Sequence, residues 1–427
     1  MIVMKEESKP RMKFIQSVGL VFLLTFTCIQ SATAKSWDLS GYYKNFSVVF
    51  NQPEIFRTEN MSRYPAIVTN RLRLDLQHDF SSNFGMALAY NFTPRIQDAQ
   101  LYEGGLLFDS FNLSGYRFQD FNDRIYRAEN GSFGIFHNLD RAYLRISPDF
   151  GDIYVGRQAI SWGGARVINP TDVIAPYSFN ELDTEEKRGV DALRIRIPLG
   201  FMGELDLGYV AGSDLKFDES AIFVRTKFYY METDVSLLLL EFKENIMFGV
   251  DLARSIEGAG TWIEAAYTLV DPFDERYSTA ANYLRASAGA DYSFNEKTYG
   301  FIEAHYNQAG TTDPGDYYFN FFENSAYSEG AVYLFATKYV IPGINYQITP
   351  LLSLTAQALY NVDDESVFLA PILEYSFAQD VYIGAGAYVG IGENPGLGGL
   401  GENTFPIFNS EFGTYPDFFY TSFRVYF

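Results

Sequence analysis

The chain of 427 residues is poor in the side chains that most often carry enzyme chemistry, with one cysteine, three histidines and three tryptophans. His78, His137 and His305 lie far apart in the sequence and form no His-x-x-x-His zinc pattern. The serine-nucleophile pattern Gly-x-Ser-x-Gly is also missing. We therefore expect no metal site, no cofactor and no enzymatic activity.

Positive charge is scarce as well. The chain has 32 Lys and Arg against 53 Asp and Glu, which gives a net charge of −21. An acidic surface repels the phosphate backbone, and this argues against a nucleic acid as partner. Much of the negative charge falls in predicted connections between strands, for example in residues 183–186, 271–275 and 363–365.

Long hydrophobic runs are missing beyond the N-terminal segment. In that segment basic residues precede an apolar run over residues 14–28, and Ala32-Thr33-Ala34 supplies a small-x-small cleavage site. A signal anchor is the alternative, but its helix would need about 20 apolar residues. We predict a signal peptide over residues 1–34, which contains the only cysteine, Cys28, and a single domain over residues 35–427. The mature chain then has no cysteine with which to form a disulfide.

What the chain has in abundance is alternation of apolar and polar residues. In residues 69–77, Leu72, Leu74 and Leu76 share one face, and the charged residues between them share the other, where they are expected to face water. The same pattern recurs in residues 141–146, 192–197, 204–209, 263–269, 284–292, 352–360 and 381–389. Several of these segments reach the nine or so residues that a tilted membrane-spanning strand needs, which is longer than the usual strand of a soluble sandwich.

The C-terminal segment alternates too, and it ends in an aromatic residue. Phe427, Val425, Phe423 and Phe419 lie on one face, with Thr421 as its single polar member. A terminal Phe on such a strand resembles the C-terminal signal of bacterial outer membrane β-barrels. The resemblance implies that the barrel assembly machinery reads Phe427, and that outer membrane lipids and lipopolysaccharide surround the protein. An aromatic content of 17% suits the aromatic girdles of such barrels.

Short and long connections alternate along the chain. Short ones are predicted near residues 81, 148, 200, 231, 257, 295, 349 and 378, with two further short links near residues 244 and 363. Long ones are predicted at roughly residues 51–65, 95–138, 158–190, 211–219, 270–281, 308–330 and 391–412. Short periplasmic turns and long outer loops are typical of membrane barrels. We predict an all-β fold, a transmembrane antiparallel up-and-down β-barrel of about 18 strands, or about 16 if the two weak links are not turns.

A barrel of this size encloses an aqueous lumen, so the charges on the polar faces become candidate pore residues. The first half of the chain supplies a basic wall from neighbouring strands: Arg71, Arg73, Arg141, Arg145, Arg157, Arg194, Arg196, Arg225 and Lys227. The second half supplies an acidic set: Asp251, Glu264, Asp291, Glu303 and Glu374. Two interpretations stay open. The wall selects anionic solutes through a field across the lumen, or the charges pair and stabilise a polar interior.

The most motif-like stretch is residues 156–166, with a Gly-Arg-Gln element and Trp162-Gly163, followed by Asn169-Pro170-Thr171-Asp172. These elements resemble a segment of alginate-exporter-like barrels and related porin-type barrels. The resemblance implies an export conduit for an anionic polysaccharide, and a third outer loop that folds inward and narrows the pore. For Trp162, a pore role and a packing role both stay open.

Three functions follow from these observations. The first is an outer membrane porin or channel for small hydrophilic, and in particular anionic, solutes. The second is an export conduit for an anionic polysaccharide. The third is a structural or adhesive surface barrel, which would conduct nothing.

Overall fold

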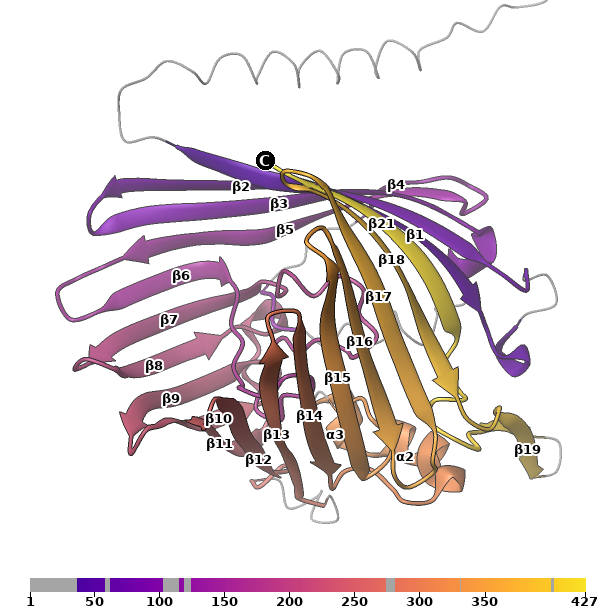
Figure 1. The fold of residues 1–427 in the computed structure, drawn as a ribbon. Helices are drawn as coiled ribbons and strands as arrows, with labels where there is room; N and C mark the ends of the chain where they lie inside the picture. The colour runs from indigo at the N-terminus through magenta and orange to yellow at the C-terminus, as the bar shows by residue number, and fades with distance from the viewer. Residues whose placement is uncertain are drawn as a thin grey trace, which may run out of the picture.

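A computed structural model describes residues 37–57, 62–102, 115–118, 124–273, 281–330, 332–400 and 403–427. The predicted signal peptide, residues 1–34, lies outside the described residues. The described chain is dominated by antiparallel strands that curve into a barrel (Figure 1). No helix in these ranges is long and apolar enough to cross a membrane.

Eighteen strands form a closed ring, which confirms the predicted all-β barrel and its larger strand count. In chain order they are β1 (Asp38–Asn51), β2 (Ala66–Ser81), β3 (Phe84–Gln97), β5 (Phe133–Ile146), β6 (Asp152–Gln158), β7 (Val190–Leu199), β8 (Gly203–Val210), β9 (Ala221–Tyr230) and β10 (Thr233–Phe242). The second half is β11 (Asn245–Ile256), β12 (Ala259–Leu269), β13 (Tyr283–Asn295), β14 (Thr298–Asn307), β15 (Lys338–Thr349), β16 (Leu352–Asn361), β17 (Val367–Ala378), β18 (Val381–Ile391) and β21 (Asp417–Tyr426). β21 pairs with both β18 and β1, which closes the ring.

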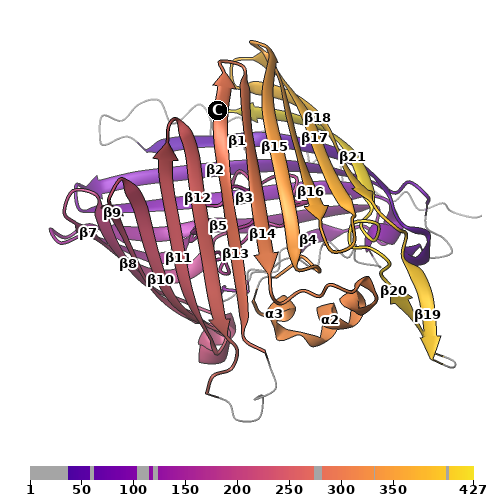
Figure 2. The same cartoon turned by 60° about the horizontal axis from the view of Figure 1, so that its bottom comes forward.

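In the part of the chain that the structure describes, three further strands lie outside this ring. β4 (Arg124–Arg127) pairs with the outer part of β5, and β19 (Gly396–Leu400) forms a separate hairpin with β20 (Asn403–Ile407). Two short helices, α2 (Tyr317–Glu323) and α3 (Ser325–Ser328), lie at the end of the barrel where the long connections gather (Figure 2).

The connections alternate as the sequence predicts. One end of the barrel has tight turns, such as Met231-Glu232 and Glu257-Gly258, whose left-handed φ angles of 47°, 61°, 50° and 89° suit two-residue hairpins. The other end has the long connections, residues 52–65, 98–132, 159–189, 211–220, 270–282, 308–337 and 392–416. The two weak links, near residues 244 and 363, are real turns at this same end. The count of 16 strands is therefore wrong.

The strand β10 shows how the sequence patterns the two faces. Leu237 and Leu239 are 45% and 47% exposed on the outer face, whereas Leu238 and Leu240 are 6% and 0% exposed on the inner face. Residues 237–240 are thus apolar on both sides. The reason is that the inner face near the long-loop end packs against other parts of the chain rather than facing water.

Two apolar groups fill much of the barrel at that end. One packs residues of the connections 159–189, 308–337 and 392–416, such as Phe179, Phe335 and Phe412, against inward residues of β15 to β18. The other packs Trp162 and Ile174 against β7 to β12. Burial of this much apolar surface is the main term that holds the connections inside the barrel.

A small polar group interrupts the outer face on β1 and β2. The Tyr43 hydroxyl donates to Asn70 Oδ1 at 2.7 Å, and Asn45 Nδ2 donates to the same oxygen at 2.9 Å. These residues share the outward parity of Leu72 and Leu74. The side chains satisfy one another, which lowers the cost of placing amides on an otherwise apolar surface.

Candidate functional site in the barrel lumen

The connection of residues 159–189, the third long connection from the N-terminus, lies inside the barrel (Figure 1). We call it the inward loop. It leaves β6, contacts β12 and β14 on the far wall, reaches β1 and β2, and returns to β7. The inward loop therefore crosses the lumen. This agrees with the expected third outer loop, which folds inward and narrows the pore.

Glu264 of β12 holds the first part of the inward loop. Its carboxylate accepts hydrogen bonds from the backbone N–H groups of Gly164 at 2.9 Å, Ala165 at 3.0 Å and Thr171 at 2.9 Å. The Thr171 hydroxyl donates to it as well, at 2.7 Å. The side chain is fully buried, so these donors replace the water that an ionised carboxylate would otherwise need.

Glu303 of β14 binds the inward loop in the same way. It accepts from the N–H groups of Arg166 at 2.7 Å and Ile168 at 2.9 Å, and from the Trp262 indole at 3.1 Å. Asp291 pairs with the Arg166 guanidinium at 2.5 Å. Three of the acidic residues predicted to face the lumen thus bind the inward loop. The sequence signal was their position on the polar faces of alternating strands.

The predicted basic wall is paired throughout with carboxylates or a hydroxyl. The shortest contacts are Arg71–Asp183 2.9 Å, Arg73–Asp140 2.7 Å, Arg141–Asp140 2.6 Å, Arg145–Asp79 2.7 Å, Arg157–Asp191 2.7 Å, Arg194–Asp206 2.6 Å, Arg196–Glu204 2.6 Å, Lys227–Asp234 3.7 Å and Arg225–Ser236 Oγ 2.9 Å. Acidic residues on the same or neighbouring strands therefore balance most of the wall locally. This arrangement favours the pairing interpretation for most of its members.

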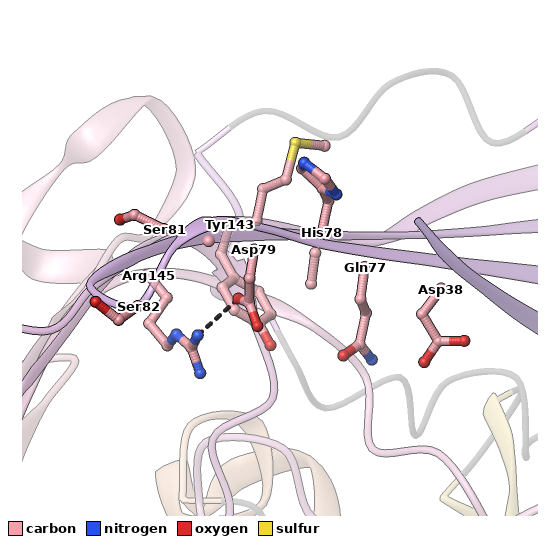
Figure 3. A pocket seen from close by; sticks show the side chains of 11 residues that line it. Asp38, Gln77, His78, Asp79, Ser81, Ser82, Tyr143 and Arg145 are labelled. Atoms are coloured by element: carbon pink, nitrogen blue, oxygen red, sulfur yellow. Dashed lines mark hydrogen bonds and ion pairs between the residues drawn. The ribbon is translucent and has the colours of Figure 1, made fainter. Parts of the chain in front are cut away.

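Arg73 departs from the expectation that it faces open water. Its side chain is 2% exposed and contacts Asp75 at 2.8 Å as well as Asp140. By contrast, the pair Arg145–Asp79 lies at the short-turn end, where Gln77 and Asp38 point to the same side of the sheet and His78 points to the other (Figure 3). Arg73 is thus buried within the lumen wall, whereas Arg145 lies at the short-turn end of the barrel.

Cavities remain on both sides of the inward loop. One in the basic sector has a volume of about 730 Å³ and brings together Arg71, Arg73 and Arg157. A second, of about 480 Å³, brings together Arg73, Arg141, Arg194 and Arg196. Across the loop, a cavity of about 300 Å³ is lined by uncharged residues such as Thr355 and Gln357 and by charged residues of both signs: Arg166, Lys187, Asp172 and Glu181.

Trp162 has a packing position. Its ring lies 4.7 Å from the ring of Phe223, measured between centroids, and its side chain is 7% exposed. Both residues belong to the apolar group against β7 to β12. Trp162 therefore anchors the base of the inward loop.

Sequence reasoning missed Lys44 of β1, which is fully buried in the lumen wall. Its ammonium contacts Asp183 at 2.9 Å and Glu185 at 2.5 Å, both on the inward loop. Glu186 of the same segment lies 3.6 Å from both Arg73 and Arg141. Lys44 occurs in an aromatic-rich segment without a clear charged face, so alternation alone did not single it out.

Glu411, in the last long connection, is a second buried carboxylate that organises the outer end. It accepts from Phe335 N at 2.9 Å, from Asn361 Nδ2 at 2.9 Å and from the Tyr339 hydroxyl at 2.5 Å. Burial raises the pKa of Glu411 from 4.5 to about 8, and the hydrogen bonds from Tyr339 and Phe335 offset only part of this rise. The folded protein therefore holds a proton there that the unfolded chain releases.

This proton makes stability depend on pH. Between pH 4.5 and about 8 the folded state binds one more proton than the unfolded state, so stability falls as the pH rises through this window. The expected slope from this group is about 1.4 kcal/mol per pH unit. In Glu411→Gln this pH-dependent contribution disappears, so the stability of the variant relative to the wild type rises toward pH 8. The thermal unfolding midpoints of the wild type and Glu411→Gln, measured across this pH window, show the difference, and the exposed Glu323→Gln serves as control. If the midpoints of the wild type and Glu411→Gln changed in parallel with pH, the raised pKa of Glu411 would be contradicted.

No family model and no curated protein matches the chain. Solved structures do align with it. Two engineered variants of the porin from Rh. blastica are each 13% identical, cover 92% of this chain and 100% of their own, and give a TM-score of 0.45. A further variant of the Rhodopseudomonas blastica porin gives 12% identity and a TM-score of 0.43 over the same shares. At such values the fold assignment rests on the strand pairing of the chain itself, and the alginate-exporter resemblance stays a prediction.

Proposed function

We propose that this protein is an outer membrane channel for small hydrophilic solutes. The observation that carries the proposal is a closed 18-stranded ring with an apolar outer face and a lumen that keeps polar cavities on both sides of the inward loop. Only a closed ring satisfies every backbone group of a sheet in lipid. A ring of this size leaves an interior wide enough for water.

The inward loop also bears on the size of the solute. Glu264 and Glu303 fix it to one wall, and apolar residues such as Phe179 fix it to another. Beside the loop lie cavities of about 300 and 730 Å³, the size of a metabolite. This supports small solutes over the polysaccharide conduit, which stays the second candidate. A structural or adhesive barrel is the third.

Planar bilayer recordings test the proposal. Purified protein is expected to give discrete conductance steps. Small sugars and carboxylates added outside lipid vesicles are expected to enter the vesicles that contain the protein. A correctly folded barrel that gives neither steps nor solute flux would leave the structural role as the better account. Flux of a long anionic polysaccharide would favour the export conduit.

We further propose that Phe427 marks the chain for the barrel assembly machinery. Its backbone pairs with Gly41 of β1 through N–H to carbonyl bonds of 2.8 and 3.0 Å, while its ring is 51% exposed at the rim. Deletion of Phe427 is expected to reduce the rate of membrane insertion in cells and leave the conductance of folded molecules unchanged. Pulse-labelled cells and heat-modifiable gel mobility measure this; insertion at the wild-type rate would remove the assembly role.

A further inference from the structure

Two cations lie side by side in the lumen wall. Lys44 of β1 and Arg71 of β2 are direct cross-strand partners, and both lie on the lumen side of their strands. Like charges directly opposite one another destabilise a sheet. The cost is higher for Lys44 because its side chain is only 1% exposed. A counter-ion must therefore stand between the two.

That counter-ion comes from the inward loop and not from the wall. Asp183 bridges the pair, with Oδ1 2.9 Å from the Lys44 ammonium and Oδ2 2.9 Å from the Arg71 guanidinium. Glu185 adds a second contact to Lys44. Within the described ranges, all ion pairs of Lys44 and Arg71 are with carboxylates of this loop.

The neighbouring arginines behave differently. Arg73 and Arg141 have a wall carboxylate, Asp140, at 2.7 and 2.6 Å, so they stay balanced whatever the loop does. Lys44 and Arg71 depend on the segment of residues 183–186. The buried carboxylates Glu264 and Glu303 hold a different part of the loop, residues 164–171. The acidic segment can thus leave the wall without release of the loop as a whole.

We propose that Lys44 and Arg71 form a carboxylate-binding subsite of the channel, which Asp183 and Glu185 occupy as an internal ligand until a solute carboxylate displaces them. The inference rests on the proposed channel function. The bound Asp183 shows the chemistry that the subsite accepts, one carboxylate with one oxygen on an ammonium and the other on a guanidinium.

Exchange of one carboxylate for another costs little, because the same ion pairs are broken and remade. The cavity of about 730 Å³ that Arg71 and Asp183 line offers room for a ligand of metabolite size next to the subsite. Tyr42 lies with its ring 4.1 Å from the Lys44 ammonium and lines the same cavity. The ligand class is therefore small organic carboxylates.

The test removes the internal ligand and keeps the subsite. Asp183→Asn with Glu185→Gln is compared with Asp214→Asn with Asp218→Asn, which makes the same charge change in an exposed outer connection. Citrate is the probe, and glucose is its neutral counterpart. In the loop variant, half-block of the single-channel current is expected at about tenfold lower citrate concentration, the factor that follows from losing one charge-assisted competitor. The control variant is expected to match the wild type, and glucose to block all chains equally.

A further substitution assigns the effect to the subsite. Addition of Lys44→Gln to the loop variant is expected to abolish the gain in citrate sensitivity. A folded loop variant that blocks like the control, or a gain that survives Lys44→Gln, would overturn the inference. If the wild type conducts nothing, the channel proposal fails instead. Calorimetry of citrate with the detergent-solubilised chains then decides the subsite alone, and equal affinity in wild type and loop variant would overturn it.

Discussion

Replacement of residues 166–186 by a short Gly/Ser linker is expected to roughly double the single-channel conductance or raise it further, because the lumen of a barrel of this size is wide without its inserts. The removed residues cross the lumen from Glu264 and Glu303 to Lys44. The linker starts after Trp162, so the apolar contact with Phe223 at the base of the loop is retained. The strands and their pairing are untouched, and the variant is expected to fold.

A matched control removes exposed chain from the same end of the barrel. Residues 213–219, which form short turns between β8 and β9, are replaced by the same linker. This control is expected to keep the wild-type conductance, since these residues lie outside the ring of strands. Equal conductance of the two folded variants would mean that the inward loop does not limit the path, and the constriction would then be sought in the apolar group around Phe412.

The strand pattern was predictable because, in the proposed outer membrane barrel, every strand faces lipid on its outer side. Outer faces such as Leu72, Leu74 and Leu76 must be apolar, and this requirement recurs every second residue along the whole ring. The turns were predictable as well, because a tight hairpin leaves only a few residues between two alternating segments, whereas a long connection leaves ten or more. Even the weak link at Lys243-Glu244 has the left-handed φ angles, 46° and 70°, of a true two-residue turn.

The interior was less predictable, because it depends on contacts between residues far apart in the sequence. Alternation placed Glu264 and Glu303 inward, but it did not show that they bind backbone N–H groups of the inward loop. It placed Arg73 inward as a residue in water, whereas the side chain is buried between two aspartates. Leu238 and Leu240 also break the rule of a polar inner face, since they pack inside the barrel.

The burial of Arg73 changes what its substitution should do. Arg73→Leu would remove the cation of Asp75 and leave Asp140 with Arg141 as its close partner, so the substitution is itself expected to destabilise the barrel. It is therefore a poor control for a lipid-facing substitution on the same strand. Gln77, exposed at the short-turn end of β2, is the better one, because it lines cavities with Arg145 and Arg196.

The lipid-facing position to test is Leu74. It lies near the middle of β2, pairs with Gly41 on one side and Tyr90 on the other, and faces outward. A guanidinium there must reach the headgroups or draw water into the hydrocarbon layer. Leu74→Arg is therefore expected to reduce the free energy of unfolding in lipid vesicles by about 2–4 kcal/mol.

Gln77→Arg places the same charge on the same strand at the opposite parity. Its side chain points to the side of the sheet that carries Asp38 and Asp79 (Figure 3), so the new guanidinium finds water and carboxylates. The expected change is within about 1 kcal/mol, the range of exposed ion pairs. Equilibrium urea unfolding of both variants, followed by tryptophan fluorescence, measures the difference. Equal losses for the two would place Leu74 away from lipid, and the outer face of β2 would then have to be covered by protein.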